Sequence, residues 1–215
     1  QGGAGVAIGA SAGNATQGAS SVAIGQLAGQ TSQGASSVAI GQSAGNNTQG
    51  ISSVAVGINA GTTTQGTQSV AIGLNSGQTN QGANNVGIGV NSGALTQGAS
   101  SVAIGGDAGR FTQGSSAVAV GTNAGRGVLS TTFQGNGAVA IGTNAGQGTT
   151  TGQGANSICI GLNAGVASAT AGSICLNASG LALNPAVAGF FVNPIRNDTT
   201  KQTQVQFNTT SEEVS

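Results

Sequence analysis

Few side chains in this chain could do chemistry, and they are thinly spread. The 215 residues include four basic and four acidic side chains, two cysteines and no histidine. Without histidine there is no Ser-His or Cys-His nucleophile and no imidazole metal ligand. Cys159 and Cys175 are too few for a zinc site, and the carboxylates are too scattered for an acid–base pair. We therefore expect no enzyme activity, no metal site and no cofactor.

The basic residues contain one local concentration. Arg110 and Arg126 are sixteen residues apart, at equivalent positions of a repeat. Two guanidinium groups stacked in this way repel unless they splay or share an anion. They are either solvated arginines at the edge of a loop or part of a binding patch for an acidic sugar or a protein surface. Such a patch would consist of Arg110, Phe111, Arg126, Leu129 and Phe133.

These residues belong to a repeat of sixteen residues. A Val-Ala-Ile-Gly unit or a close variant starts at Val6, Val22, Val38, Val54, Val70, Val86, Val102, Val118, Val139, Ile158 and Ile174. A fixed short period is typical of a solenoid, and sixteen residues suit two short strands per turn. The sequence predicts an all-β fold, a parallel β-solenoid of about eleven coils. We assign residues 1–184 to it and residues 185–215 to a C-terminal cap or transition segment.

Alternation within the unit predicts which side chains share a face. Val and Ile flank Ala, so the two branched side chains point to one side of the strand and Ala to the other. We expect the branched pair to fill the coil interior and Ala to form a flat outer surface. This core ladder would include Val22, Ile24, Val38, Ile40, Val102 and Ile104.

Amide side chains recur in two further columns. Stacked amides can hydrogen-bond from one coil to the next. We therefore predict an amide ladder, in which Asp107 occupies the Asn column. Its members include Gln33, Gln49, Gln65, Asn59, Asn75 and Asn91.

The period lapses twice, at residues 126–133 and 147–152, and both insertions fall at the same position of the unit. That corner should face outward and tolerate a loop.

Cys159 and Cys175 are one period apart, close enough for a disulfide if stacked, although both replace the small Ala of the unit. Small-residue packing is the favoured interpretation of the two cysteines.

The unit Ser-Val-Ala-Ile-Gly followed by x-x-Ala-Gly resembles the head repeats of trimeric autotransporter adhesins, the YadA-like left-handed parallel β-roll, over roughly residues 4–180. This resemblance implies a left-handed coil and a homotrimer about a three-fold axis. Residues 188–197 and 206–215 are similar to segments of phage and giant-virus fibre proteins, where they precede a self-cleaving intramolecular chaperone.

These features favour a non-enzymatic fibre or adhesin head, extracellular or on a cell or virion surface, that attaches multivalently. The expected partners are copies of itself and a cell-surface glycan or protein receptor. Zero net charge and the absence of a long apolar run argue against nucleic acid and membrane insertion. The alternative is a self-assembling filament in which open ends stack head to tail. An ice-binding solenoid is less favoured, because Asn80 interrupts the Thr column.

Overall fold

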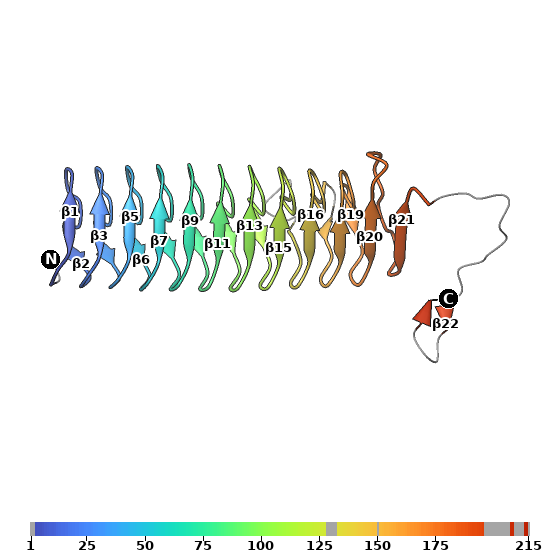
Figure 1. The fold of residues 1–215 in the computed structure, drawn as a ribbon, viewed down its shortest axis with the longest axis horizontal. Helices are drawn as coiled ribbons and strands as arrows, with labels where there is room; N and C mark the ends of the chain where they lie inside the picture. The colour runs from blue at the N-terminus through green and yellow to red at the C-terminus, as the bar shows by residue number, and fades with distance from the viewer. Residues whose placement is uncertain (1–2, 128–132, 150, 196–206, 209–212, 215) are drawn as a thin grey trace.

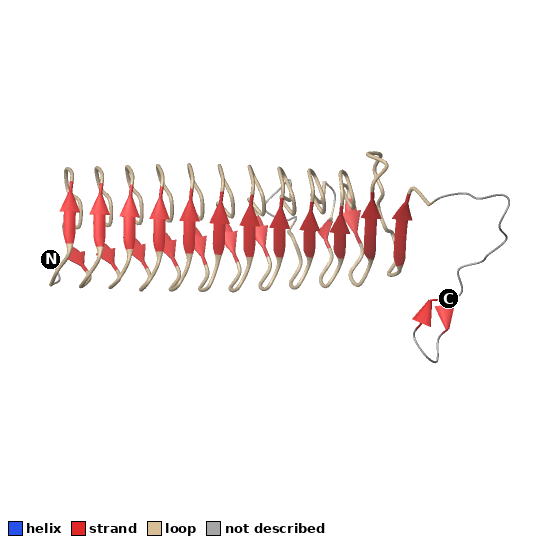
Figure 2. Ribbon diagram, viewed as in Figure 1, coloured by secondary structure: helices blue, strands red, loops and turns tan. Residues whose placement is uncertain are grey.

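The chain winds into a straight stack of coils, each about sixteen residues long (Figure 1). A computed structural model describes residues 3–127, 133–149 and 151–195 and two short strands at 207–208 and 213–214. Figure 2 shows strands and loops, and no helix in the described part is long and apolar enough to cross a bilayer. The predicted all-β parallel solenoid is confirmed.

The larger sheet is parallel and has twelve strands, one from each coil. Neighbouring strands pair in register, so that Val22 lies beside Val38 and Ala23 beside Ala39. The strands are β1 (Val6–Ile8), β3 (Val22–Ile24), β5 (Val38–Ile40), β7 (Val54–Val56), β9 (Val70–Ile72), β11 (Val86–Ile88), β13 (Val102–Ile104), β15 (Val118–Val120), β16 (Val139–Ile141), β18 (Ile158–Ile160), β20 (Ile174–Asn177) and β21 (Phe190–Asn193).

A second parallel sheet of seven two-residue strands forms the other wall of the coil. Its strands are β2 (Thr16–Gln17), β4 (Ser32–Gln33), β6 (Thr48–Gln49), β8 (Thr64–Gln65), β10 (Asn80–Gln81), β12 (Thr96–Gln97) and β14 (Thr112–Gln113). The same column continues through a bridge at Gln134 to the pair β17 (Gly152–Gln153) and β19 (Ser168–Ala169). Near the C-terminus, β22 (Phe207–Asn208) and β23 (Glu213–Val214) pair antiparallel.

The glycine after each Val-Ala-Ile strand is required by the stacking of the coils. Gly73 has a φ of 124°, and a Cβ placed there would lie 2.5 Å from the backbone oxygen of Gly89 in the next coil. Asn75, two residues later, has a φ of 55°, a left-handed conformation that Asn tolerates better than most residues. Each coil therefore turns at a fixed place between its two sheets.

Small side chains and glutamine line the interior of the coil. The central Ala residues of β3, β5 and β13 are fully buried, whereas their neighbours in the same strands are half-buried or exposed on the outer face. The predicted core ladder is therefore wrong: the side chains face outward at Val22, Ile24, Val38, Ile40, Val102 and Ile104.

The reason for this inversion is the thinness of the coil. Gln33 lies in the second sheet, is only 3% exposed, and donates from Nε2 to the backbone oxygen of Val22 in the first sheet at 2.7 Å. One glutamine side chain thus spans the gap between the walls. Beside it, a Cβ on Gly29 would lie 2.9 Å from Gln33 Oε1, so there is no room for branched side chains. Sequence alternation establishes which residues share a face, but not which face is inside.

The two amide columns differ in their hydrogen bonds. In the Asn column, Asn59 donates to Asn75 at 3.2 Å and Asn75 donates to Asn91 at 3.1 Å, which confirms this part of the amide ladder. The amides of Gln33, Gln49 and Gln65 instead donate to backbone oxygens in their own coils, each at 2.7 Å. Bonds between glutamines of successive coils occur later, for example from Gln113 to Gln134 at 3.0 Å.

The inserted residues leave the stacking intact. Val118 pairs with Val139 and Val139 with Ile158, so the larger sheet keeps its register through both lapses of the period. Leu129 lies outside the described residues.

At the C-terminal end, β21 pairs in parallel with β20 at the sixteen-residue spacing, so the sheet continues past residue 184. The division into 1–184 and 185–215 remains a prediction.

Candidate functional site

An apolar surface runs along the outer face of the larger sheet. We call it the apolar stripe, and it consists of Val22, Ile24, Val38, Ile40, Val54, Val56, Val70, Ile72, Val86, Ile88, Val102, Ile104, Val118, Val120, Val139, Ile141, Ile158 and Ile160. Each member is half-buried or exposed. Soluble monomers rarely expose contiguous apolar surface of this extent, so the stripe is a candidate interaction surface.

The stripe is widened and extended by further apolar side chains. Exposed Ile58, Leu74 and Val90 follow the strands in three consecutive coils and broaden it near its middle. At the C-terminal end, the outer face opens into an apolar hollow of about 380 Å³ lined by Ile160, Leu176, Val192 and Pro194 among others. The larger sheet therefore presents apolar groups along almost its whole length.

The charged side chains of the described solenoid gather in one place. Asp107, Arg110 and Arg126 are the charged residues between positions 3 and 195 of the described chain. Arg110 Nη1 lies 3.5 Å from Asp107 Oδ1, and Arg126 Nε lies 4.0 Å from Asp107 Oδ2. The two arginines thus share an anion supplied by the chain itself. We call these three residues the charge cluster.

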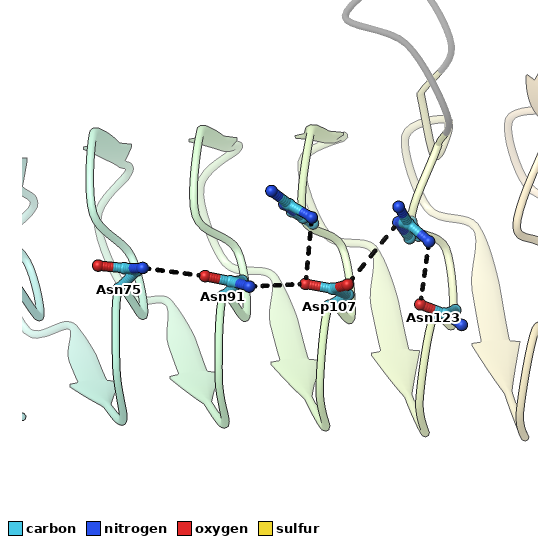
Figure 3. Close-up of polar contacts among 6 residues, drawn as sticks. Asn75, Asn91, Asp107 and Asn123 are labelled. Carbon is cyan, nitrogen blue, oxygen red and sulfur yellow. Dashed lines mark hydrogen bonds and ion pairs between the residues drawn. The ribbon is translucent and has the colours of Figure 1, made fainter.

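The charge cluster is built into the Asn ladder (Figure 3). Asn91 donates from Nδ2 to Asp107 Oδ1 at 2.9 Å. Asp107 has no side-chain NH2 group like that of Asn to donate to the next coil, so the amide ladder is interrupted there. Arg126 Nη1 supplies a donor to Asn123 Oδ1 at 3.3 Å, and the ladder resumes as Asn123 donates to Asn144 at 3.0 Å.

The structure brings part of the predicted patch together. The guanidinium carbon of Arg110 lies 5.2 Å from the centre of the Phe111 ring, which is within the range of a cation–π contact. Arg126 joins Arg110 through Asp107, and Phe133 is 51% exposed at the end of the first insertion. The sequence reasoning missed Asp107 as a member. Its signal was available, since Asp107 is the one acidic residue in a column that is otherwise Asn from Asn59 to Asn163.

A row of hydroxyl groups runs along the outer face of the second sheet and ends at Thr112, two residues after Arg110. The row consists of Thr16, Ser32, Thr48, Thr64, Thr96 and Thr112, with Asn80 in the same column. All are exposed except Thr112, which is half-buried next to Phe111. Within the described part of the chain these hydroxyls have no hydrogen-bond partner. They are therefore free to bind water or a polar ligand.

The two cysteines are buried free thiols in the Ala column, and they pair in register on β18 and β20. A hydrogen bond with Cys175, followed by burial, raises the pKa of the Cys159 thiol above its ordinary value. A thiol held protonated in this way is a poor nucleophile. In the described chain no three His, Cys, Asp or Glu side chains are grouped as metal ligands.

The fold and surface together define a parallel β-solenoid with a small-residue interior and an apolar outer stripe. No protein-family model, curated protein sequence or solved structure matches the chain. The stripe and the charge cluster are therefore the features that bear on its function.

Proposed function

We propose that this chain is the rod-shaped head of a non-enzymatic, homo-oligomeric fibre or adhesin that works on a cell or virion surface. In this proposal the apolar stripe is the contact between copies, and the remaining faces are displayed to a receptor. The observation that carries the proposal is the outward orientation of Val and Ile in coil after coil.

A second copy of the same chain is the partner that fits the stripe best. Its apolar groups repeat once per coil, at the strand spacing of about 4.8 Å. Another rod with the same repeat can match this period over the full length, whereas an irregular surface cannot. The stripe also lacks charge, so two stripes can meet without burying an unpaired ion. The resemblance to YadA-like heads favours three copies around one axis.

The displayed faces would act through multivalency. Copies held side by side present the same sites at fixed spacing, so that weak contacts combine into avidity. A filament formed by head-to-tail stacking is the alternative assembly.

The test is the oligomeric state of the chain and of a stripe variant. Ile40, Ile72 and Ile104 lie on alternate coils and are each 37% exposed. Full burial of an isoleucine is worth about 1.5–3 kcal/mol, so covering the exposed third contributes about 0.5–1 kcal/mol per side chain. We expect the wild type to have three times the 20.1 kDa chain mass by light scattering, and the variant Ile40→Lys/Ile72→Lys/Ile104→Lys to be monomeric.

The matched control adds the same three charges to the second sheet, as Ser32→Lys/Thr64→Lys/Thr96→Lys. These positions are also on alternate coils, and we expect this variant to keep the wild-type mass. A monomeric wild type, or equal dissociation of both variants, would refute the stripe as the contact. Rods of unlimited length in negative-stain microscopy would support the filament instead.

A further inference from the structure

We propose that the charge cluster and the adjoining hydroxyl row form a binding site for an acidic saccharide, with a sugar carboxylate held by Arg110 and Arg126. The site deepens the proposed attachment function by naming a class of ligand. Binding itself requires only the folded rod, so it can be measured whether or not the copies associate.

The charge balance of the cluster leaves room for an anion. Two guanidinium groups face one carboxylate, that of Asp107, so the cluster has an excess of one positive charge. Asp107 is also engaged by the Asn91 amide. An arginine has five N–H donors, and the contacts of Arg110 and Arg126 within the described chain use only some of them. A second carboxylate can therefore bind without displacing Asp107.

Both arginines can be reached from solvent while being held in place. Their side chains are 36% and 27% exposed, respectively. Arg110 is fixed by Asp107 and the Phe111 ring, and Arg126 is fixed by Asp107 and the Asn123 amide oxygen. Holding the guanidinium groups in advance lowers the entropy lost on binding.

The surroundings favour a saccharide over a simple anion. The hydroxyl row is uncharged and, apart from half-buried Thr112, exposed. Thr96 lies beside Thr112 in the register of β12 and β14, and Thr112 follows Arg110 by two residues in the same coil. Hydroxyl groups can both donate to and accept from sugar hydroxyls. An extended oligosaccharide lying along the rod would meet one protein hydroxyl in each coil that carries Ser or Thr. One of its carboxylates would lie at Arg110 and Arg126.

The experiment measures binding of a hexameric oligogalacturonate, which carries carboxylates and no sulfate, by isothermal titration calorimetry. We expect one saccharide per chain, binding that weakens as salt is raised, and a loss of about tenfold in affinity for Arg110→Gln and for Arg126→Gln. Neutral maltohexaose should bind at least tenfold more weakly than the uronate. Thr96→Val, which removes one hydroxyl at nearly constant shape, should weaken binding of the uronate by a few fold.

The matched control is Thr67→Glu, at an exposed position away from the cluster. It changes the net charge by the same amount as each arginine substitution, and we expect wild-type binding. The site is refuted if both arginine variants bind within twofold of the wild type, or if Thr67→Glu weakens binding as much as they do. Arginine-dependent binding of dextran sulfate without binding of the uronate would overturn the carboxylate assignment. Loss of the oligomer with retained arginine-dependent binding would count against the assembly alone.

Discussion

The buried glutamine column provides a sensitive test of how the coil interior is built. Gln65 is 1% exposed, and its Nε2 donates to the backbone oxygens of Val54 at 2.7 Å and Ser69 at 3.2 Å. The substitution Gln65→Glu keeps the size of the side chain but replaces the donor by an oxygen. At neutral pH it places a carboxylate against two carbonyl oxygens inside the coil. We expect this substitution to be strongly destabilising.

The magnitude follows from the pKa of the introduced carboxyl group. Burial and the two facing oxygens both disfavour the ionised form, and such environments raise a glutamic acid pKa by about 3 units or more. At about 1.4 kcal/mol per unit, the loss of stability at pH 7 is about 4 kcal/mol. Because the folded-state pKa is raised, the penalty must shrink as the pH falls toward the unfolded pKa of about 4.3. Protonated Glu can again donate to Val54.

The assay is chemical unfolding followed by circular dichroism at pH 7 and pH 4. The matched control is Gln68→Glu in the same coil, where the side chain is exposed, and we expect a change within about 0.5 kcal/mol. The reasoning fails if Gln65→Glu is as stable as Gln68→Glu at pH 7, or if acid does not restore part of the lost stability.

Two further predictions concern the coil backbone and the buried thiols. Gly73→Ala should lower the free energy of unfolding by about 2 kcal/mol or more, because the new Cβ would lie 2.5 Å from the backbone oxygen of Gly89 at a left-handed φ. The control is Gly106→Ala, where a Cβ meets nothing within 4 Å. It should be neutral or slightly stabilising in the same unfolding assay. Because the pKa of the Cys159 thiol is raised in the folded protein, its contribution to the free energy of unfolding is fully present below the unfolded thiol pKa of about 8.5. Above that pH the contribution falls by about 1.4 kcal/mol per pH unit. The chain has no Tyr or His, so the variant Cys159→Ala/Cys175→Ala should not show this fall in the free energy of unfolding between pH 9 and 10. An unchanged fall in that variant would show that Cys159 is not its cause.

The stacking of the coils was predictable because it depends only on the repeat. A sixteen-residue period places Val22 beside Val38 and Asn75 beside Asn91, and the structure pairs them in this way. The position of the insertions was also informative. Both fall at a corner, and so the strands on either side keep their partners.

The inner and outer faces could not be assigned from alternation alone. Hydrophobicity favoured Val and Ile inside, but the decisive quantity is the distance between the two walls, which the period does not state. A better signal was the size of the residues in each column. The inner column contains Ala, Gly87, Cys159 and Cys175, all small, whereas the outer positions accept Val, Ile or Leu. The acidic character of Asp107 was visible in the sequence, but its contacts with two arginines depend on side-chain geometry between coils, which the period does not specify.

This inversion also changes where the hydrophobic stabilisation of the chain lies. The interior buries Ala methyl groups, Ser and Gln, which remove little apolar surface from water in comparison with Val and Ile. The coil is instead held by backbone ladders and by buried amides with backbone partners, whose net contribution per bond is modest. The larger apolar groups remain on the stripe, where their burial contributes fully only when another surface covers them. In the proposed oligomer, association therefore completes the hydrophobic burial that folding of a single rod leaves unfinished. The free energy of unfolding of the rod would then increase with protein concentration, because a higher concentration favours the oligomer.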